Sequence, residues 1–105
     1  MRKKMTTKEK IINKAFKTVG ERNNHYGTPL ENFERIAKFW SCHLEHHISV
    51  YDVGVMLMLL KIARSKHDSL HEDTWIDIAG YAGATAEATF LDEKINKEMR
   101  EWAKS

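Results

Sequence analysis

Apolar residues recur at helical spacing along most of the chain. From about Thr7 to Val19, residues such as Ile11, Ala15 and Phe16 share one face, and this helix is expected to stop near Gly20. The polar residues 21–27 are expected to form a loop.

A second helix follows, with a stripe that includes Phe33, Ile36 and Trp40 predicted to face the core. A third, from about Val50 to Lys66, is apolar nearly all round between Val53 and Leu60. A helix of this kind is expected in the middle of a bundle.

Helix starts are indicated by a hydroxyl residue followed three positions later by an acidic one, the pattern of a capping box. The pattern occurs four times, as Thr6-x-x-Glu9, Thr28-x-x-Glu31, Ser49-x-x-Asp52 and Ser69-x-x-Glu72. Pro29 strengthens the second, because proline suits the first helical position. The third is the weakest match, since Asp is not the usual acid there.

The fourth helix would begin near Ser69 and, with no later proline, would run to Lys104. Its length of roughly 54 Å is large for a compact domain whose radius of gyration is about 13 Å. Either it breaks within residues 80–86, or the tail 88–105 packs on another subunit. The stripe of Leu91, Ile95 and Trp102 favours the second alternative. The fold expected is an all-α, compact and oligomeric four-helix bundle, or a five-helix bundle if the helix breaks.

Length and composition favour one domain over residues 1–105, with residues 1–5 disordered. Cys42 is the sole cysteine, which suits a reducing compartment. The basic N-terminus lacks the apolar run of a signal peptide, and Val53 to Leu60 is too short to cross a bilayer. The net charge of +2 is spread along the chain, which makes nucleic acid an improbable partner. We expect a soluble, cytoplasmic protein.

Asp73, Asp77 and Tyr81 are four residues apart and share one face of the fourth helix. Two carboxylates one turn apart can hold a cation or a ribose, and Gly80 and Gly83 would let a flat ligand approach the backbone. Alternatively, Asp73 complements the helix dipole and the glycines allow close packing. Asp77 lies deeper in the helix and is not explained in this way.

Lys61 and Arg64 stand at the polar end of the apolar third helix, where they suit a phosphate. Alternatively, Lys61 and Arg64 only stabilise the C-terminal end of their own helix, where cations interact favourably with the helix dipole. Together with Asp73 and Asp77, they would form a charge network that lines one pocket. Asn32 and Arg35, near the start of the second helix, would read a base or phosphate, or else lie exposed.

Metal binding is suggested most directly by His43 and His47, which have the spacing of two ligands on one helix face. No third ligand is specified by spacing, and the general base of a zinc protease motif is absent. We expect solvated or loop-packed histidines here.

Several ordered segments resemble a family of small domains of unknown function found in bacteriophages and prophages. They are Tyr26 to Trp40, Asp52-Val53, Leu60 to Arg64 and Asp73 to Tyr81. The segment from Lys61 to Tyr81 is also similar to phage domains associated with nucleotide modification, and more distantly to MazG-like all-helical nucleotide pyrophosphohydrolases. The resemblance, over about Tyr26 to Glu87, implies a helical fold, phage origin, oligomerisation and a nucleotide-like ligand.

The hydrolases bind magnesium through an E-x-x-E pair and a later E-x-x-D pair. Here Glu31 and Glu34 have the first spacing, although Glu31 is also the capping partner of Thr28, and the second pair is replaced by Asp73-x-x-x-Asp77. Metal-assisted hydrolysis needs several carboxylates around the cation. The departure therefore favours binding without turnover.

The leading hypothesis is a nucleotide-binding phage protein that sequesters a host nucleotide immune signal in the cytoplasm of an infected bacterium. Phosphate would meet Lys61, Arg64 and Arg35, sugar or base would meet Asp73 and Asp77, and Tyr81 or Trp40 would stack. No cofactor is expected. The first alternative is a magnesium-dependent pyrophosphohydrolase that uses Glu34, Asp73 and Asp77, and the second is a helical protein–protein interaction module.

Overall fold

The structure, a computed structural model, describes residues 4–105, and every regular element among them is a helix. The helices are α1 (Thr7–Tyr26), α2 (Pro29–Leu44), α3 (Val50–Ser65) and α4 (Glu72–Lys104). The all-helical prediction is confirmed. Because α4 is unbroken through residues 80–86, the five-helix alternative is not realised. Of the segment expected to be disordered, residues 1–3 lie outside the described part.

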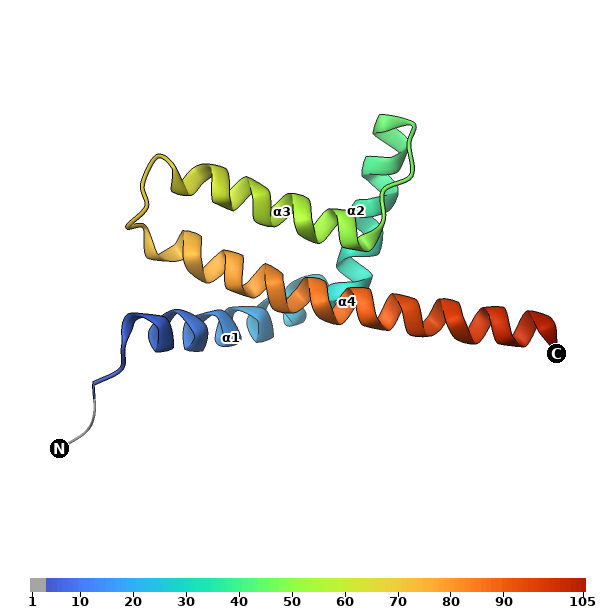
Figure 1. Cartoon of the computed structure of the whole chain (residues 1–105), viewed down its shortest axis with the longest axis horizontal. Coiled ribbons are helices and arrows are strands. Elements are labelled where there is room, and N and C mark those ends of the chain that lie inside the picture. The colour runs from blue at the N-terminus through green and yellow to red at the C-terminus, as the bar shows by residue number, and fades with distance from the viewer. Residues whose placement is uncertain (1–3) are drawn as a thin grey trace.

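α4 is the central element and contacts each of the other three helices (Figure 1). α1 runs parallel to α4, since Lys14 pairs with Glu72 near the start of α4 and Arg22 meets Tyr81 further along. α3 runs antiparallel to α4, since Lys61 near its end pairs with Asp77. α2 stands across the other helices.

The main core lies where α2, α3 and α4 meet. Its buried members are Leu30, Phe33, Ala37, Val50, Val53 and Ala88. Phe33 retains only 2% of its surface, and Val53 and Ala88 retain none. Burial of these apolar side chains holds α2 against α3 and α4. The predicted core stripe of α2 is thus confirmed at Phe33, but Leu44, which was also expected in it, is 53% exposed.

Three of the four predicted helix starts are confirmed. The side chains of Thr6, Thr28 and Ser49 accept from the amides of Glu9, Glu31 and Asp52. The motif judged weakest from its sequence forms a complete capping box, since the Asp52 carboxylate accepts from the Ser49 amide at 3.0 Å. An aspartate is therefore long enough to close the box here.

The fourth predicted start, at Ser69, is wrong. α4 begins at Glu72, and its N-cap residue His71 makes no side-chain capping bond. The Asp68 carboxylate accepts from the Leu70 amide, and the Ser69 carbonyl accepts from the indole of Trp75. These bonds hold the connection in a turn that extends past Ser69 before the helix begins.

The predicted stop of the first helix near Gly20 is also wrong, because α1 continues to Tyr26 and the expected loop 21–27 is largely helical. The helix ends at Gly27, whose φ of +84° is a conformation that glycine adopts at little cost. Gly20 is tolerated inside α1, since the cost of a helical glycine is only about 1 kcal/mol.

The expectation of a compact bundle is not met. The chain measures 61 × 34 × 21 Å, and its radius of gyration of 16.6 Å exceeds the roughly 13 Å of a compact domain of this length. Most of the excess is the C-terminal part of α4, which projects beyond the other helices (Figure 1). Its predicted packing on another subunit stays a prediction.

α3 is not in the middle of a bundle, contrary to the prediction. One side packs on α4, but Tyr51, Leu59 and Ile62 keep 56%, 55% and 43% of their surface exposed. The apolar pattern predicted burial on all sides of α3, whereas α2 and α4 bury only part of its surface. No helix in the described part is long and apolar enough to cross a membrane.

Candidate functional site

The candidate site is built around an ion pair between α3 and α4. The Lys61 ammonium lies 2.9 Å from the Asp77 carboxylate, and the two side chains are only 17% and 19% exposed. Asp77 lies in the second turn of α4 and Lys61 lies near the C-terminal end of α3. The antiparallel packing of the helices thus brings together two residues singled out from the sequence.

A groove extends from this pair to the connection between α3 and α4. It is lined by Lys61, Arg64, His67, Asp68, His71, Asp73, Thr74 and Asp77. Its volume of about 430 Å³ falls in the range of small-molecule sites, roughly 300–1,000 Å³. Lys61, Arg64, Asp73 and Asp77 therefore line one groove, although only Lys61 and Asp77 among them form an ion pair in the described structure.

Two groups in the groove are available to a ligand. Among the described residues, neither Arg64 nor Asp73 forms an ion pair, and both are exposed. The groove also lies at the start of α4, where the helix dipole is positive and His71 supplies no side-chain cap. Arg64 and the helix start would favour a negatively charged group.

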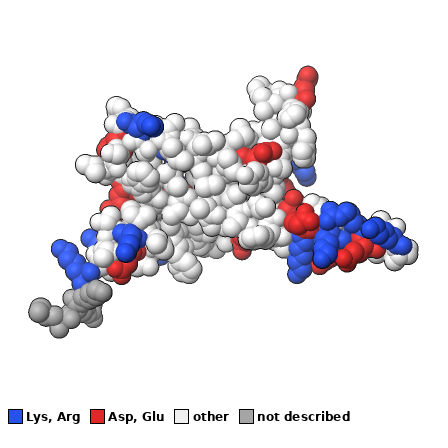
Figure 2. All heavy atoms as spheres, viewed as in Figure 1, with Lys and Arg blue, Asp and Glu red and all other residues white. Residues whose placement is uncertain are grey.

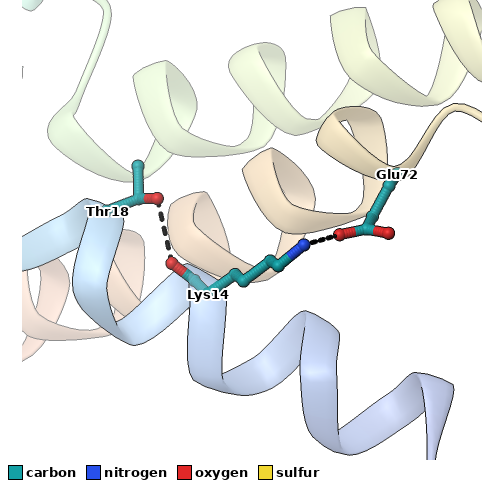
Figure 3. A network of polar contacts seen from close by, with 3 residues as sticks. All are labelled: Lys14, Thr18 and Glu72. Atoms are coloured by element: carbon teal, nitrogen blue, oxygen red, sulfur yellow. Dashed lines mark hydrogen bonds and ion pairs between the residues drawn. The ribbon is translucent and has the colours of Figure 1, made fainter.

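The neighbouring acid, Glu72, is bound elsewhere. Its carboxylate accepts from the ammonium of Lys14 on α1, and the carbonyl of Lys14 accepts from the Thr18 hydroxyl (Figure 3). The hydrogen bond from Lys14, and its charge, hold the pKa of the Glu72 carboxyl below its usual value. Of the two acids in the first turn of α4, Asp73 alone lines the groove.

A second hollow lies where α1, α2 and α4 meet, and it shares Asp77 with the groove. Its lining includes Asn32, Gly80 and Tyr81, which the sequence singled out, together with Arg22, Asn23 and Tyr26. The Arg22 guanidinium lies 5.6 Å from the centre of the Tyr81 ring and donates to its hydroxyl at 3.4 Å. At about 50 Å³, the hollow has room for a few water molecules rather than a whole ring system.

Sequence reasoning missed Arg22, Asn23 and Tyr26 because it placed them in a loop. The missing signal was their spacing, since residues 22 and 23 lie three and four positions after residue 19, and residue 26 lies four and three positions after them, which places all four on one helix face. A helix predicted to continue past Gly20 would have placed these residues on the same face as Val19.

Arg35 and Trp40 line neither hollow. Arg35 is exposed on α2, and Trp40 packs against the core cluster. Arg35 is therefore not placed to bind a phosphate in the groove, and Trp40 is not placed to stack on a base there.

The residues proposed as metal ligands are not gathered either. Glu34 is exposed on α2, and no group of three or more His, Cys, Asp or Glu side chains within residues 4–105 is placed to hold a metal ion. α2 ends at Leu44, so His43 and His47 do not share a helix.

Comparison with known proteins places the chain in a family. Residues 10–89 match the family described as a domain of unknown function, DUF6378. The chain belongs to this family. It is also 42% identical to the Gene 55 proteins of Mycobacterium phages D29 and L5, over 95 and 100 residues.

These relatives support the expected likeness to a small phage protein family of unknown function. The matches cover 90% and 93% of this chain but 62% and 60% of the relatives, so the chain spans about three fifths of their length. No solved structure matches the chain significantly. The predicted relation to MazG-like hydrolases stays a prediction.

Proposed function

We propose that this phage-family protein binds a nucleotide-type small molecule in the groove between α3 and α4 and retains it without turnover. The observation that carries the proposal is that Lys61, Arg64, Asp73 and Asp77 line one groove of suitable volume. Cations for phosphate and carboxylates for sugar hydroxyls thus stand within one ligand's reach of each other.

Phosphate would bind Arg64 and the start of α4. Arg64 is exposed and in no ion pair among the described residues, so it binds an anion without first breaking a bond. A guanidinium also matches phosphate oxygens in bidentate geometry. Lys61 would bind the same phosphate from the side and remain close to Asp77.

Sugar hydroxyls would donate to Asp73 and Asp77, one turn apart on α4. The hollow on the other side of Asp77 would receive at most the edge of a base, unless Arg22 moves away from the Tyr81 ring. Retention without turnover is favoured over hydrolysis because Glu34 is not gathered with Asp73 and Asp77. Such a binder, made during infection, would sequester a host nucleotide signal.

The proposal is tested by differential scanning fluorimetry with mono-, di- and cyclic nucleotides, with and without magnesium. A nucleotide at 100 times its dissociation constant should stabilise the fold by about 2.7 kcal/mol. Arg64→Ala should weaken binding at least tenfold, whereas the control Lys97→Ala, on the exposed part of α4, should not.

The fate of the ligand separates retention from catalysis. After incubation and denaturation, the nucleotide should be recovered intact by liquid chromatography and mass spectrometry. Pyrophosphate release over many turnovers would replace the proposal with the hydrolase alternative. If no nucleotide shifts the melting temperature, the proposal that the groove binds a nucleotide is wrong.

A further inference from the structure

We propose that the groove between α3 and α4 selects nucleotides that carry a single negative charge, as a phosphodiester does, over nucleotides with a chain of phosphates. The inference rests on the proposed function, because it names the class of ligand for that same groove. Two observations carry it: the balance of the charges that line the groove, and the places of Arg64 and Asp73, which form no ion pair among the described residues.

The charged side chains of the groove do not make it a cationic site. Its lining holds two cations and three carboxylates, namely Lys61, Arg64, Asp68, Asp73 and Asp77. The net charge of the lining is therefore −1 when His67 and His71, which also belong to it, are uncharged. Figure 2 shows the same mixture in space, since Lys and Arg atoms are interspersed with Asp and Glu atoms where α3 ends and α4 begins. A polyphosphate would meet net repulsion in such a groove.

Arg64 is the cation that remains available to a ligand. Lys61 and Asp77 form a partly buried ion pair, so their charges largely cancel. The Asp68 carboxylate accepts from the Leu70 amide and stays negative in the turn before α4. Arg64 thus supplies the one positive charge of the lining that no carboxylate of the described residues pairs with. One such cation matches one phosphate charge, and each further phosphate would lie near a carboxylate without a cation of its own.

Arg64 and Asp73 lie at the same end of the groove. Because α3 and α4 are antiparallel and Lys61 meets Asp77, Arg64, three residues later on α3, lies alongside the turn of α4 before Asp77. Asp73 belongs to that turn and lines the same groove. A ligand that fits between the two side chains has one anionic group for the guanidinium and a hydroxyl donor for the carboxylate. A ribonucleoside phosphodiester has both groups, whereas the charges of a triphosphate would crowd Asp73.

Isothermal titration calorimetry with a matched series of ligands measures this preference. For each of the common ribonucleosides, the probes are the methyl ester of the 5′-monophosphate, the 5′-monophosphate and the 5′-triphosphate, with one, about two and about four negative charges. Base and sugar are constant within a series, so differences in affinity report the phosphate. The titrations are run at pH 8, where histidines are largely uncharged, and in EDTA, so that no metal ion bridges phosphate and carboxylate. In every series that binds, the methyl ester should bind at least about tenfold more tightly than the triphosphate.

Asp73→Asn tests whether this carboxylate causes the discrimination. Asparagine keeps an acceptor for a sugar hydroxyl but removes the charge, so the methyl ester should still bind and its advantage over the triphosphate should fall several-fold. Asp73 is exposed, so the variant is expected to fold. The matched control is Glu98→Gln, on the projecting part of α4 where charges of both signs crowd together (Figure 2). It should leave the ratio of the two affinities unchanged.

The outcomes separate this inference from the proposed function. A triphosphate that binds as tightly as the methyl ester, or a ratio that Asp73→Asn leaves unchanged, overturns the charge selection but leaves nucleotide binding in place. If none of the probes binds, the inference fails. The proposed function fails with it if the cyclic nucleotides of its own test also leave the melting temperature unchanged.

Discussion

Gly54 of α3 packs directly against Thr85 of α4, and a β-carbon added to Gly54 would stand 2.0 Å from the Thr85 hydroxyl oxygen. Both residues are buried. The contact sets how closely α3 and α4 approach, and therefore how closely Lys61 approaches Asp77 two turns further along α3.

Gly54→Ala is accordingly expected to destabilise the protein by about 1–3 kcal/mol, the cost of overpacking. Urea unfolding followed by circular dichroism measures the change. Gly20→Ala is the matched control, since nothing lies within 4 Å of its added β-carbon and it should stabilise α1 by about 0.5–1 kcal/mol. Equal effects of the two substitutions would contradict the close approach at Gly54.

Thr85 itself carries a buried hydroxyl oxygen with no hydrogen-bond partner in the described structure. Thr85→Val replaces this hydroxyl with a methyl group of similar size and removes a desolvation cost of about 1–3 kcal/mol. The variant should match or exceed the wild-type midpoint of urea unfolding. A clear loss of stability would show that the hydroxyl has a partner, such as an ordered water.

The helices themselves were largely predictable because capping and hydrophobic spacing are local properties. Ser49 and Asp52 made the capping box from their own side chains, and the stripe of α2 that includes Phe33 is buried as expected. Ser69 failed because a competing turn, closed by Asp68, is not visible in the capping pattern. Gly20 failed because a single glycine costs too little to end a helix.

The packing and the site were less predictable because they depend on which face of each helix packs against which neighbouring helix. Lys61 and Asp77, both singled out from the sequence, form an ion pair in the structure. Arg22, which was not singled out, lies beside Tyr81 only because α1 extends past Gly20. The apolar sequence of α3 predicted burial on all sides, whereas Tyr51, Leu59 and Ile62 are about half exposed, because sequence periodicity does not show which neighbouring helices reach a given face.

The pair of Lys61 and Asp77 should contribute to both stability and ligand binding, and the two contributions are separable. Asp77→Asn leaves a poorly solvated ammonium without its partner, so it should cost about 1–3 kcal/mol. The double variant Lys61→Met with Asp77→Leu should regain most of this stability, because an apolar pair can replace a poorly solvated ion pair. Neither variant should bind nucleotide. Urea unfolding measures the stability of each variant, and calorimetric titration measures its affinity for nucleotide. Wild-type affinity in the double variant would show that this pair does not belong to the binding site.

Acid should weaken the start of α3 through Asp52. Hydrogen bonds from the Ser49 amide and then the Ser49 hydroxyl hold the pKa of the Asp52 carboxyl below its ordinary value. A carboxyl whose pKa is lower in the folded state stabilises the fold above its unfolded pKa, about 3.9, and that contribution disappears as the pH falls through the folded pKa. Wild type should therefore exceed Asp52→Asn in stability at pH 7, with the difference shrinking as the pH falls below about 3.9. Urea unfolding across this range measures it, and Asp92→Asn on α4 is the control. A difference that grows as the pH falls would reverse the sign and refute the role assigned to the capping box.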